Sequence, residues 1–373
     1  MQRSTQFKVI LTTGLALFAM FFGAGNIIFP LQLGTLTGQH ILSGLLGFIL
    51  SGVGVPFLGL FAVAMYEGDY WRFFDRYGRV TAFIIATFLI LIIGPLFATP
   101  RTEIVTYSTL YPALPQLFKN PYVFDLAYFG IVFLLVYKPS RVVEVIGLVL
   151  SPVKITAFVI LIIVGLYTTL PHSTQPWTAA HTFNTAFTMG YNTMDLLGTF
   201  FVGRIAYQYI VFKANQTTTT LSPEYIVKMT LYACLIGAAL ISLVYIGLIF
   251  TAAAHAQALQ NTPTEALIRK ISDIVLGQYG SLFVGICVSF ACLATAAALT
   301  AVTAEYFYTI ITRELVSRFY CLLIVLVIMY MMAILGFEKI MGIAIPILKV
   351  LYPVLIVMCV INIAAKLKRP VSS

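Results

Sequence analysis

The stretch that decides the fold is Phe21-Phe22-Gly23-Ala24-Gly25-Asn26-Ile27-Ile28-Phe29-Pro30, which lies within the first long apolar segment of the chain. Glycine is a poor helix former and asparagine is polar, so a helix that crosses lipid gains nothing from them at mid-depth. Non-helical backbone at that depth is tolerated only where protein buries it or where it lines a cavity. A break of this kind frees main-chain N–H and C=O groups, which hold substrate and coupling ion in secondary transporters. The stretch therefore predicts a binding site made of peptide groups.

Composition indicates that the rest of the chain lies in a membrane. Of 373 residues, 60% are hydrophobic and only 9% are charged, and the mean hydropathy is +0.98, which excludes a water-soluble domain. Apolar runs predict ten spans, near residues 9–32, 41–65, 80–105, 122–137, 142–169, 183–211, 223–252, 279–307, 318–336 and 340–365. We expect an all-α polytopic membrane protein. Its first run is too long for a signal-peptide core, so we expect a retained span.

The net charge is +9, and the distribution of the Lys and Arg residues along the chain indicates the topology. If both termini are cytoplasmic, fifteen Lys and Arg residues fall on the inner side and only five on the outer side, namely Arg101, Lys119, Arg269, Lys270 and Lys339. This asymmetry follows the positive-inside rule. The expected partners are therefore membrane lipid and a small solute, not nucleic acid, and the sequence does not specify an oligomeric state.

A second interruption lies in the sixth predicted span, over Gly190-Tyr191-Asn192-Thr193-Met194-Asp195-Leu196-Leu197-Gly198. Five spans separate it from the first. Corresponding broken helices in two halves of a chain indicate an inverted repeat with a binding site at the membrane midplane. We expect one integral membrane domain, with a five-helix repeat over 9–169, an inverted five-helix repeat over 183–365, and helices one and six broken.

Other classes of protein fit the sequence less well. No HExxH, Ser-Lys or paired-carboxylate pattern appears inside the predicted membrane region, so we do not expect an enzyme. The four histidines are scattered, so we expect no metal centre of that kind and no organic cofactor. A channel would show polar or charged rings along a pore, whereas polarity here concentrates at two interruptions.

Ordered blocks along nearly the whole chain carry a family resemblance. They are Phe18 to Pro30, Gly94 to Thr102, Ser151 to Ile155, Gly190 to Asp195, Ala291 to Ala296, Ile345-Pro346 and Tyr352-Pro353. In these blocks the chain resembles the branched-chain amino acid cation symporters, bacterial carriers of leucine, isoleucine and valine in the amino acid/polyamine/cation superfamily. The resemblance implies a leucine-transporter type of fold, alternating access, and a location in the bacterial inner membrane. Family members are commonly longer, whereas this chain ends after the ten-helix core.

Candidate substrate-binding residues come from both interruptions. The amides of Gly23, Ala24, Gly25 and Asn26 are good donors to a carboxylate, although small residues also serve close helix packing. Carbonyls near Gly190, Tyr191 and Asn192 would accept from the substrate ammonium. Asp195 is costly at mid-span, by roughly 2.5–3.5 kcal/mol. It is expected to bind the ammonium, a cation or a proton, or else to form a structural bond to a neighbour such as Thr193.

The resemblance also implies a coupling-ion site. It places Na⁺ ligands at the carbonyls of Ala19, Phe22 and Ala291 and at the hydroxyl of Thr295, although such a hydroxyl often bonds its own helix backbone. Lys154 is the alternative, because a lysine in the fifth helix replaces sodium in some proton-coupled relatives; it is equally suited to an ion pair or to reaching the interface. We favour Na⁺ over H⁺. The predicted function is import of leucine, isoleucine and valine by cation symport, and the alternative is a carrier of another small neutral solute.

Overall fold

The computed structural model describes residues 3–137, 155–167, 177–215 and 222–368, and these residues form helices, turns and loops without a β-strand. The apolar runs seen in the sequence account for this, because backbone groups in lipid must bond within their own segment. The predicted all-helical class is confirmed for the described part of the chain.

The first half begins with a bent pair of helices. α1 (Arg3–Phe21) and α2 (Ala24–Leu36) meet at an angle of 72°. The elements that follow are α3 (Ile41–Ile49), a π-helical turn (Leu50–Gly54), α4 (Val55–Ala64), α5 (Tyr70–Asp75), α6 (Arg79–Leu91), a π-helical turn (Ile92–Leu96), α7 (Ala98–Leu110), α8 (Pro121–Tyr137) and a helix over Ile155–Tyr167. Lys154 lies outside the described residues.

The second half contains the three longest of the described helices. Its helices are α10 (Ala179–Gly190), α11 (Asp195–Asn215), α12 (Pro223–Ala254), α13 (Leu267–Tyr306), α14 (Arg318–Ala333) and α15 (Phe337–Lys368). The three longest are α12, α13 and α15. Within α13, Gly277 has a φ of +69° and divides a short outer segment from the long apolar part of the helix. A positive φ is accessible to glycine at little cost, which explains why this residue carries the kink.

Helix length identifies the chain as a multi-pass membrane protein. Within the described residues, five helices are long and apolar enough to cross a membrane, and the bent pair of α1 and α2 adds a sixth. Three shorter apolar helices, Pro121–Tyr137, Ile155–Tyr167 and Arg318–Ala333, lie beside them.

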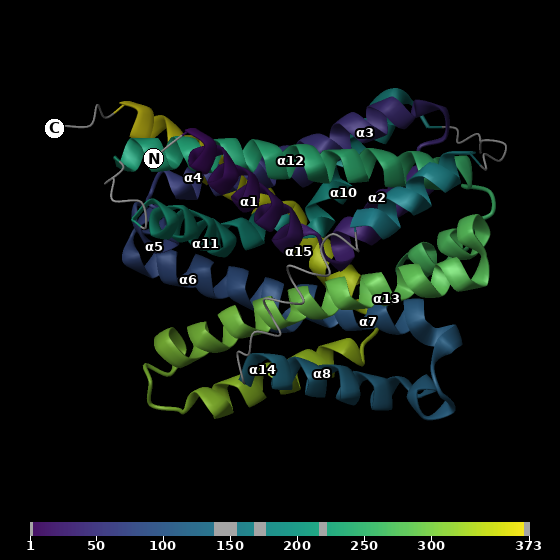
Figure 1. Cartoon of the computed structure of the whole chain (residues 1–373). Helices are drawn as coiled ribbons and strands as arrows, with labels where there is room; N and C mark the ends of the chain where they lie inside the picture. The colour runs from purple at the N-terminus through teal and green to yellow at the C-terminus, as the bar shows by residue number, and fades with distance from the viewer. Residues whose placement is uncertain (1–2, 138–154, 168–176, 216–221, 369–373) are drawn as a thin grey trace.

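The helices form a bundle with its polar centre away from lipid. α12 packs along α1 and α2, α10 packs on α3, and α8 and α14 lie side by side against α13 (Figure 1). The start of α1 and the end of α15 lie at the same end of the bundle, and the α7–α8 connection lies at the opposite end (Figure 1). Large exposed apolar side chains, such as Leu243 and Val350, face outward from long helices, as lipid contact requires.

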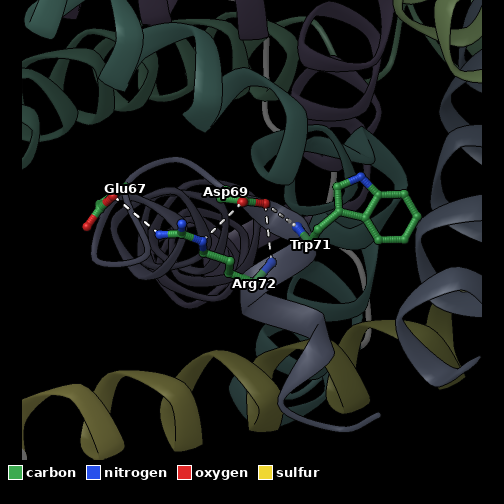
Figure 2. A network of polar contacts seen from close by, with 4 residues as sticks. All are labelled: Glu67, Asp69, Trp71 and Arg72. Carbon is green, nitrogen blue, oxygen red and sulfur yellow. Dashed lines mark hydrogen bonds and ion pairs between the residues drawn. The ribbon is translucent and has the colours of Figure 1, made fainter. Parts of the chain in front are cut away.

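A polar turn connects α4 to α5 at the end of the bundle that holds the start of α1. Figure 2 shows Asp69 accepting from the amides of Trp71 and Arg72, which caps α5, while Arg72 reaches Glu67 at 3.4 Å and Asp69 at 3.5 Å. The Arg72 side chain is 66% exposed, so these ion pairs contribute little beyond shaping the turn.

Candidate functional site

The first interruption separates α1 from α2 at Phe22 and Gly23. The Gly23 N–H donates to Phe21 O at 2.8 Å and also approaches Asn26 Oδ1 at 3.3 Å. It therefore does not bond Ala19 O, as it would in a continuous α-helix. The amides of Ala24 and Gly25 begin α2, where the first N–H groups of a helix have no partner within it.

The second interruption separates α10 from α11. A 3₁₀ turn over Tyr191–Thr193 is followed by Met194 in a left-handed conformation, with a φ of 65°. Non-glycine residues rarely adopt this region, and such residues cluster at functional sites. The Thr193 hydroxyl donates to Gly190 O at 3.0 Å and accepts from the Asp195 amide at 3.4 Å, which holds the turn closed.

A buried network joins the two interruptions. The Asn26 side-chain amide donates to Asp195 Oδ2 at 2.5 Å and to the Tyr245 hydroxyl at 2.6 Å, and that hydroxyl lies 3.5 Å from Asp195 Oδ2. Asn26 and Asp195 are 169 residues apart in the chain, and Tyr245 comes from α12. Asp195 thus makes structural bonds, as one of its predicted roles required, and it also lines a cavity.

Arg101 is the site residue that the sequence analysis misplaced. The charge count put it at the outer surface, but its side chain is 3% exposed and lies between the two interruptions. Its guanidinium donates to Asn192 O at 2.6 Å and to Thr193 O at 3.3 Å, and it stacks 5.3 Å from the centroid of the Phe29 ring. The sequence feature that could have indicated its burial was its position inside the predicted apolar run 80–105. Because α7 extends this run to Leu110, Arg101 lies well inside the run.

The central cavity lies where the interruptions meet. Its lining includes Gly23, Ala24, Gly25, Asn26, Asp195 and Thr295 among the predicted site residues, together with Arg101, Thr102, Thr193 and apolar side chains such as Met20, Phe21, Ile93 and Val202. A cation, a carboxylate, helix-start amides and an apolar wall therefore share one small space. That combination suits a zwitterion with an aliphatic side chain.

The other predicted substrate residues lie behind this lining. Gly190 packs so closely on Ser51 that a Cβ would overlap its hydroxyl, and Tyr191 stacks on Tyr352 with ring centroids 4.3 Å apart. The Asn192 carbonyl was predicted to accept a hydrogen bond from the substrate ammonium. In this structure it accepts one from Arg101. In this conformation these residues build the wall around the cavity.

The residues predicted to hold sodium are partly brought together. A Cβ on Gly23 would lie 3.1 Å from Thr295 Oγ1, so α13 meets the first interruption at this hydroxyl. Within the described part of the chain Thr295 makes no hydrogen bond, whereas Ser289 and Thr303 on the same helix bond their own backbone. Ala291 is buried one turn before Thr295, and Phe22 adjoins the break. No cluster of His, Cys, Asp and Glu residues suited to a metal ion occurs among the described residues.

The fold and the buried polar cavity define a multi-pass membrane transport protein. MhsT in complex with L-phenylalanine has a similar fold, with a TM-score of 0.64 and 16% identity over 96% of this chain and 92% of that one. The inward-facing form of Mhp1 is also similar, with a TM-score of 0.67 and 13% identity over 94% of this chain and 75% of that one. At such low identity the likeness shows the fold alone, and this fold agrees with the predicted leucine-transporter type.

The sequence identifies the family. The profile described as branched-chain amino acid transport protein matches residues 6–371, and the chain belongs to this family. The branched-chain amino acid permease BraB of Bacillus subtilis is 30% identical over 98% of this chain and 82% of its own length. The branched-chain amino acid transport system 3 carrier protein of Pseudomonas aeruginosa is 32% identical over 95% of this chain and 80% of its own length. These relatives are carriers and not enzymes.

Proposed function

We propose that this protein imports leucine, isoleucine and valine by cation symport through alternating access, with Na⁺ as the coupling ion. The observation that carries the proposal is the meeting of two helix interruptions at one cavity through Asn26 and Asp195. Helix interruptions that face each other hold substrate and ion in secondary transporters. The names of the relatives supply the class of amino acid.

Each end of the amino acid has a partner in this proposal. The substrate carboxylate binds the helix-start amides of Ala24 and Gly25 beside the Arg101 guanidinium, and the ammonium binds Asp195. Met20, Phe21 and Val202 cover the aliphatic side chain. A charged substrate side chain would lie against this apolar wall without a partner, which is costly.

The ion site in the proposal lies next to this cavity. Na⁺ binds the carbonyls of Ala19, Phe22 and Ala291 and the Thr295 hydroxyl, all of which are hard oxygen ligands. The Ala19 carbonyl has lost its α-helical partner, and the Thr295 hydroxyl is unbonded within the described residues. Lys154 is the alternative coupling group.

The proposed topology has ten spans in the bacterial inner membrane with both termini cytoplasmic. Residues 9–169 and 183–365 form two inverted five-helix repeats, and the broken helices are the first of each repeat. The observed interruptions at Phe22 and Met194 support this arrangement.

Uptake into proteoliposomes tests the function. With Na⁺ and pH gradients imposed separately, we expect saturable uptake of labelled leucine, isoleucine and valine, and little uptake of lysine or glutamate. Equal transport of a charged amino acid would contradict the proposed substrate class. Leucine uptake that is unchanged when choline replaces Na⁺ at fixed pH would contradict sodium coupling.

A further inference from the structure

A pair of buried carboxyl groups lies outside the central site. Glu103 on α7 is 1% exposed and Asp125 on α8 is 4% exposed, and both side chains line one cavity. The sequence shows no paired-carboxylate motif here, because Glu103 and Asp125 lie on different helices and only the packing of α7 on α8 brings these helices together.

Neither carboxyl group forms an ion pair with a residue in the part of the chain that the structure describes. The ion pairs within the described residues join Arg72 to Glu67 and Asp69, and Arg318 to Glu305. Glu103 Oε1 is buried and has no hydrogen-bond partner there. Two carboxyl groups that share a buried cavity resist double ionisation while they stay together, since each charge opposes the other and both lose solvation. A hydrogen bond between the two groups would require a proton on one of them.

A second cavity gives the pair access to one end of the bundle. Its lining includes Glu103 and Asp125, and the titratable or charged groups that face them are Tyr107, Tyr111, Tyr122, Glu265 and Arg269. Tyr128, also on α8, bonds Thr102 next to Glu103 in the chain. The cavity's lining residues Tyr111, Pro121 and Tyr122 belong to the α7–α8 connection and the start of α8. That connection lies at the end of the bundle away from the start of α1 (Figure 1). The second cavity shares no lining residue with the central cavity.

One hydrogen bond joins α8 to α7 beside the pair and next to the central cavity. Tyr128, one turn after Asp125 on α8, donates from its hydroxyl to Thr102 Oγ1 at 3.0 Å. Thr102 lies between Arg101 and Glu103 in sequence and lines the central cavity together with Arg101. A change at the carboxyl pair therefore acts on the same helical turn that holds the guanidinium.

We propose that Glu103 and Asp125 form a proton-binding site, loaded from the second cavity, whose occupancy controls transport through the central cavity. On loading, an O–H bond forms between one carboxylate oxygen and a proton delivered by hydronium in the outer water, and the second carboxylate accepts a hydrogen bond from it. On unloading, the proton returns to water and the pair is driven apart by like charge. This site is separate from the proposed Na⁺ site, and protons and Na⁺ act together in the same cycle.

Infrared spectroscopy of the purified full chain in lipid nanodiscs tests the site without transport. We expect the wild type to show a carboxylic-acid C=O band at neutral pH that shifts in Glu103→Gln, because an amide replaces the carboxyl group beside Asp125. Asp125→Asn replaces the other partner and is expected to shift the same band. Glu305→Gln is the matched control, since Glu305 is an exposed acid paired with Arg318. The band is expected to persist in it, and in Asp195→Asn.

The pH profile of leucine uptake at saturating Na⁺ gives a second readout. Wild-type uptake is expected to rise as the outer pH falls, whereas Glu103→Gln is expected to give one rate across the range. An unchanged infrared band in both carboxyl variants, or a pH profile in Glu103→Gln that follows the wild type, would overturn the proton site. Either result leaves the proposed function standing. Absence of leucine uptake in the wild type would instead overturn the proposed function, and the infrared result would still decide the proton site.

Discussion

Arg101 bonds the second interruption and packs against Gly25 in the first. Its planar guanidinium reaches the carbonyls of Asn192 and Thr193 at once, which a lysine ammonium on a flexible stem cannot reproduce. Its charge also faces the cavity that contains Asp195. Arg101 therefore bonds the wall of the cavity and also presents its charge to the proposed substrate.

Replacing Arg101 is expected to destabilise the protein. In Arg101→Leu two buried carbonyls lose their donor, which costs about 1–3 kcal/mol for each unsatisfied group, and Arg101→Lys should lie between that variant and the wild type. Thermal unfolding in detergent measures the effect. Arg318→Leu, which removes an exposed ion pair, should unfold at nearly the wild-type temperature. Equal unfolding temperatures for Arg101→Leu and Arg318→Leu would show that the Arg101 bonds do not hold the site.

Gly25 makes room for that guanidinium. A Cβ at this position would lie 2.5 Å from Arg101 Nη2 and 3.2 Å from Thr193 O, so Gly25→Ala must displace one of them. Overpacking of about 1–3 kcal/mol in the binding site predicts leucine binding weaker by about 5- to 150-fold. Protection of the protein by leucine against thermal unfolding measures the change. The control is Gly342→Ala in α15, where a Cβ meets no atom within 4 Å; if both variants are protected equally, the substrate lies elsewhere.

At the element scale, the contact between α13 and the break after α1 defines the proposed ion site. Thr295 meets Gly23 there with an unbonded hydroxyl, within the described residues, while Ser289 bonds Gly285 O at 2.7 Å on the same helix. Ser289 therefore bonds the backbone of α13, whereas the Thr295 hydroxyl on the same helix is available to the proposed ion.

Thr295→Ala is expected to raise the Na⁺ concentration needed for half-maximal leucine uptake, because it removes one of the proposed oxygen ligands. Ser289→Ala, which loses only a bond to its own helix, should keep the wild-type Na⁺ dependence. Uptake at a series of Na⁺ concentrations and fixed pH compares the two. Identical Na⁺ curves for Thr295→Ala and wild type would exclude the Thr295 hydroxyl as a ligand.

The sequence predicted the elements better than their contacts. Gly23 to Asn26 and Gly190 to Asp195 mark interruptions by composition alone, since Gly, Asn and Asp do not favour a helix in lipid. The sequence could not predict that Asn26 bonds Asp195, because this bond depends on how α2 and α11 meet. Arg101 was misplaced for a related reason, since a charge in an apolar run suggests that the span ends there unless carbonyls freed by another helix are known to bond it.

At the scale of the whole molecule, the proposed topology can be tested by labelling. The five cysteines are buried and free of disulfides, so single added cysteines can be labelled in the natural background. In intact cells a membrane-impermeant maleimide is expected to label Leu117→Cys, before α8, and to spare Leu315→Cys, before α14, until the membrane is opened. Leu117 is 66% exposed and Leu315 is 88% exposed, so access is not limited by protein. The reverse labelling pattern would invert the proposed topology.

The two interruptions, joined by Asn26 and Asp195, are proposed to bind a branched-chain amino acid. An experimental structure of the wild-type protein with leucine, determined in lipid nanodiscs by cryo-electron microscopy, tests it most directly. We expect leucine density in the central cavity, with the carboxylate at the start of α2 beside Arg101 and the ammonium at Asp195. Leucine bound outside this cavity, with the Asn26–Asp195 bond and the cavity lining unchanged, would contradict the account.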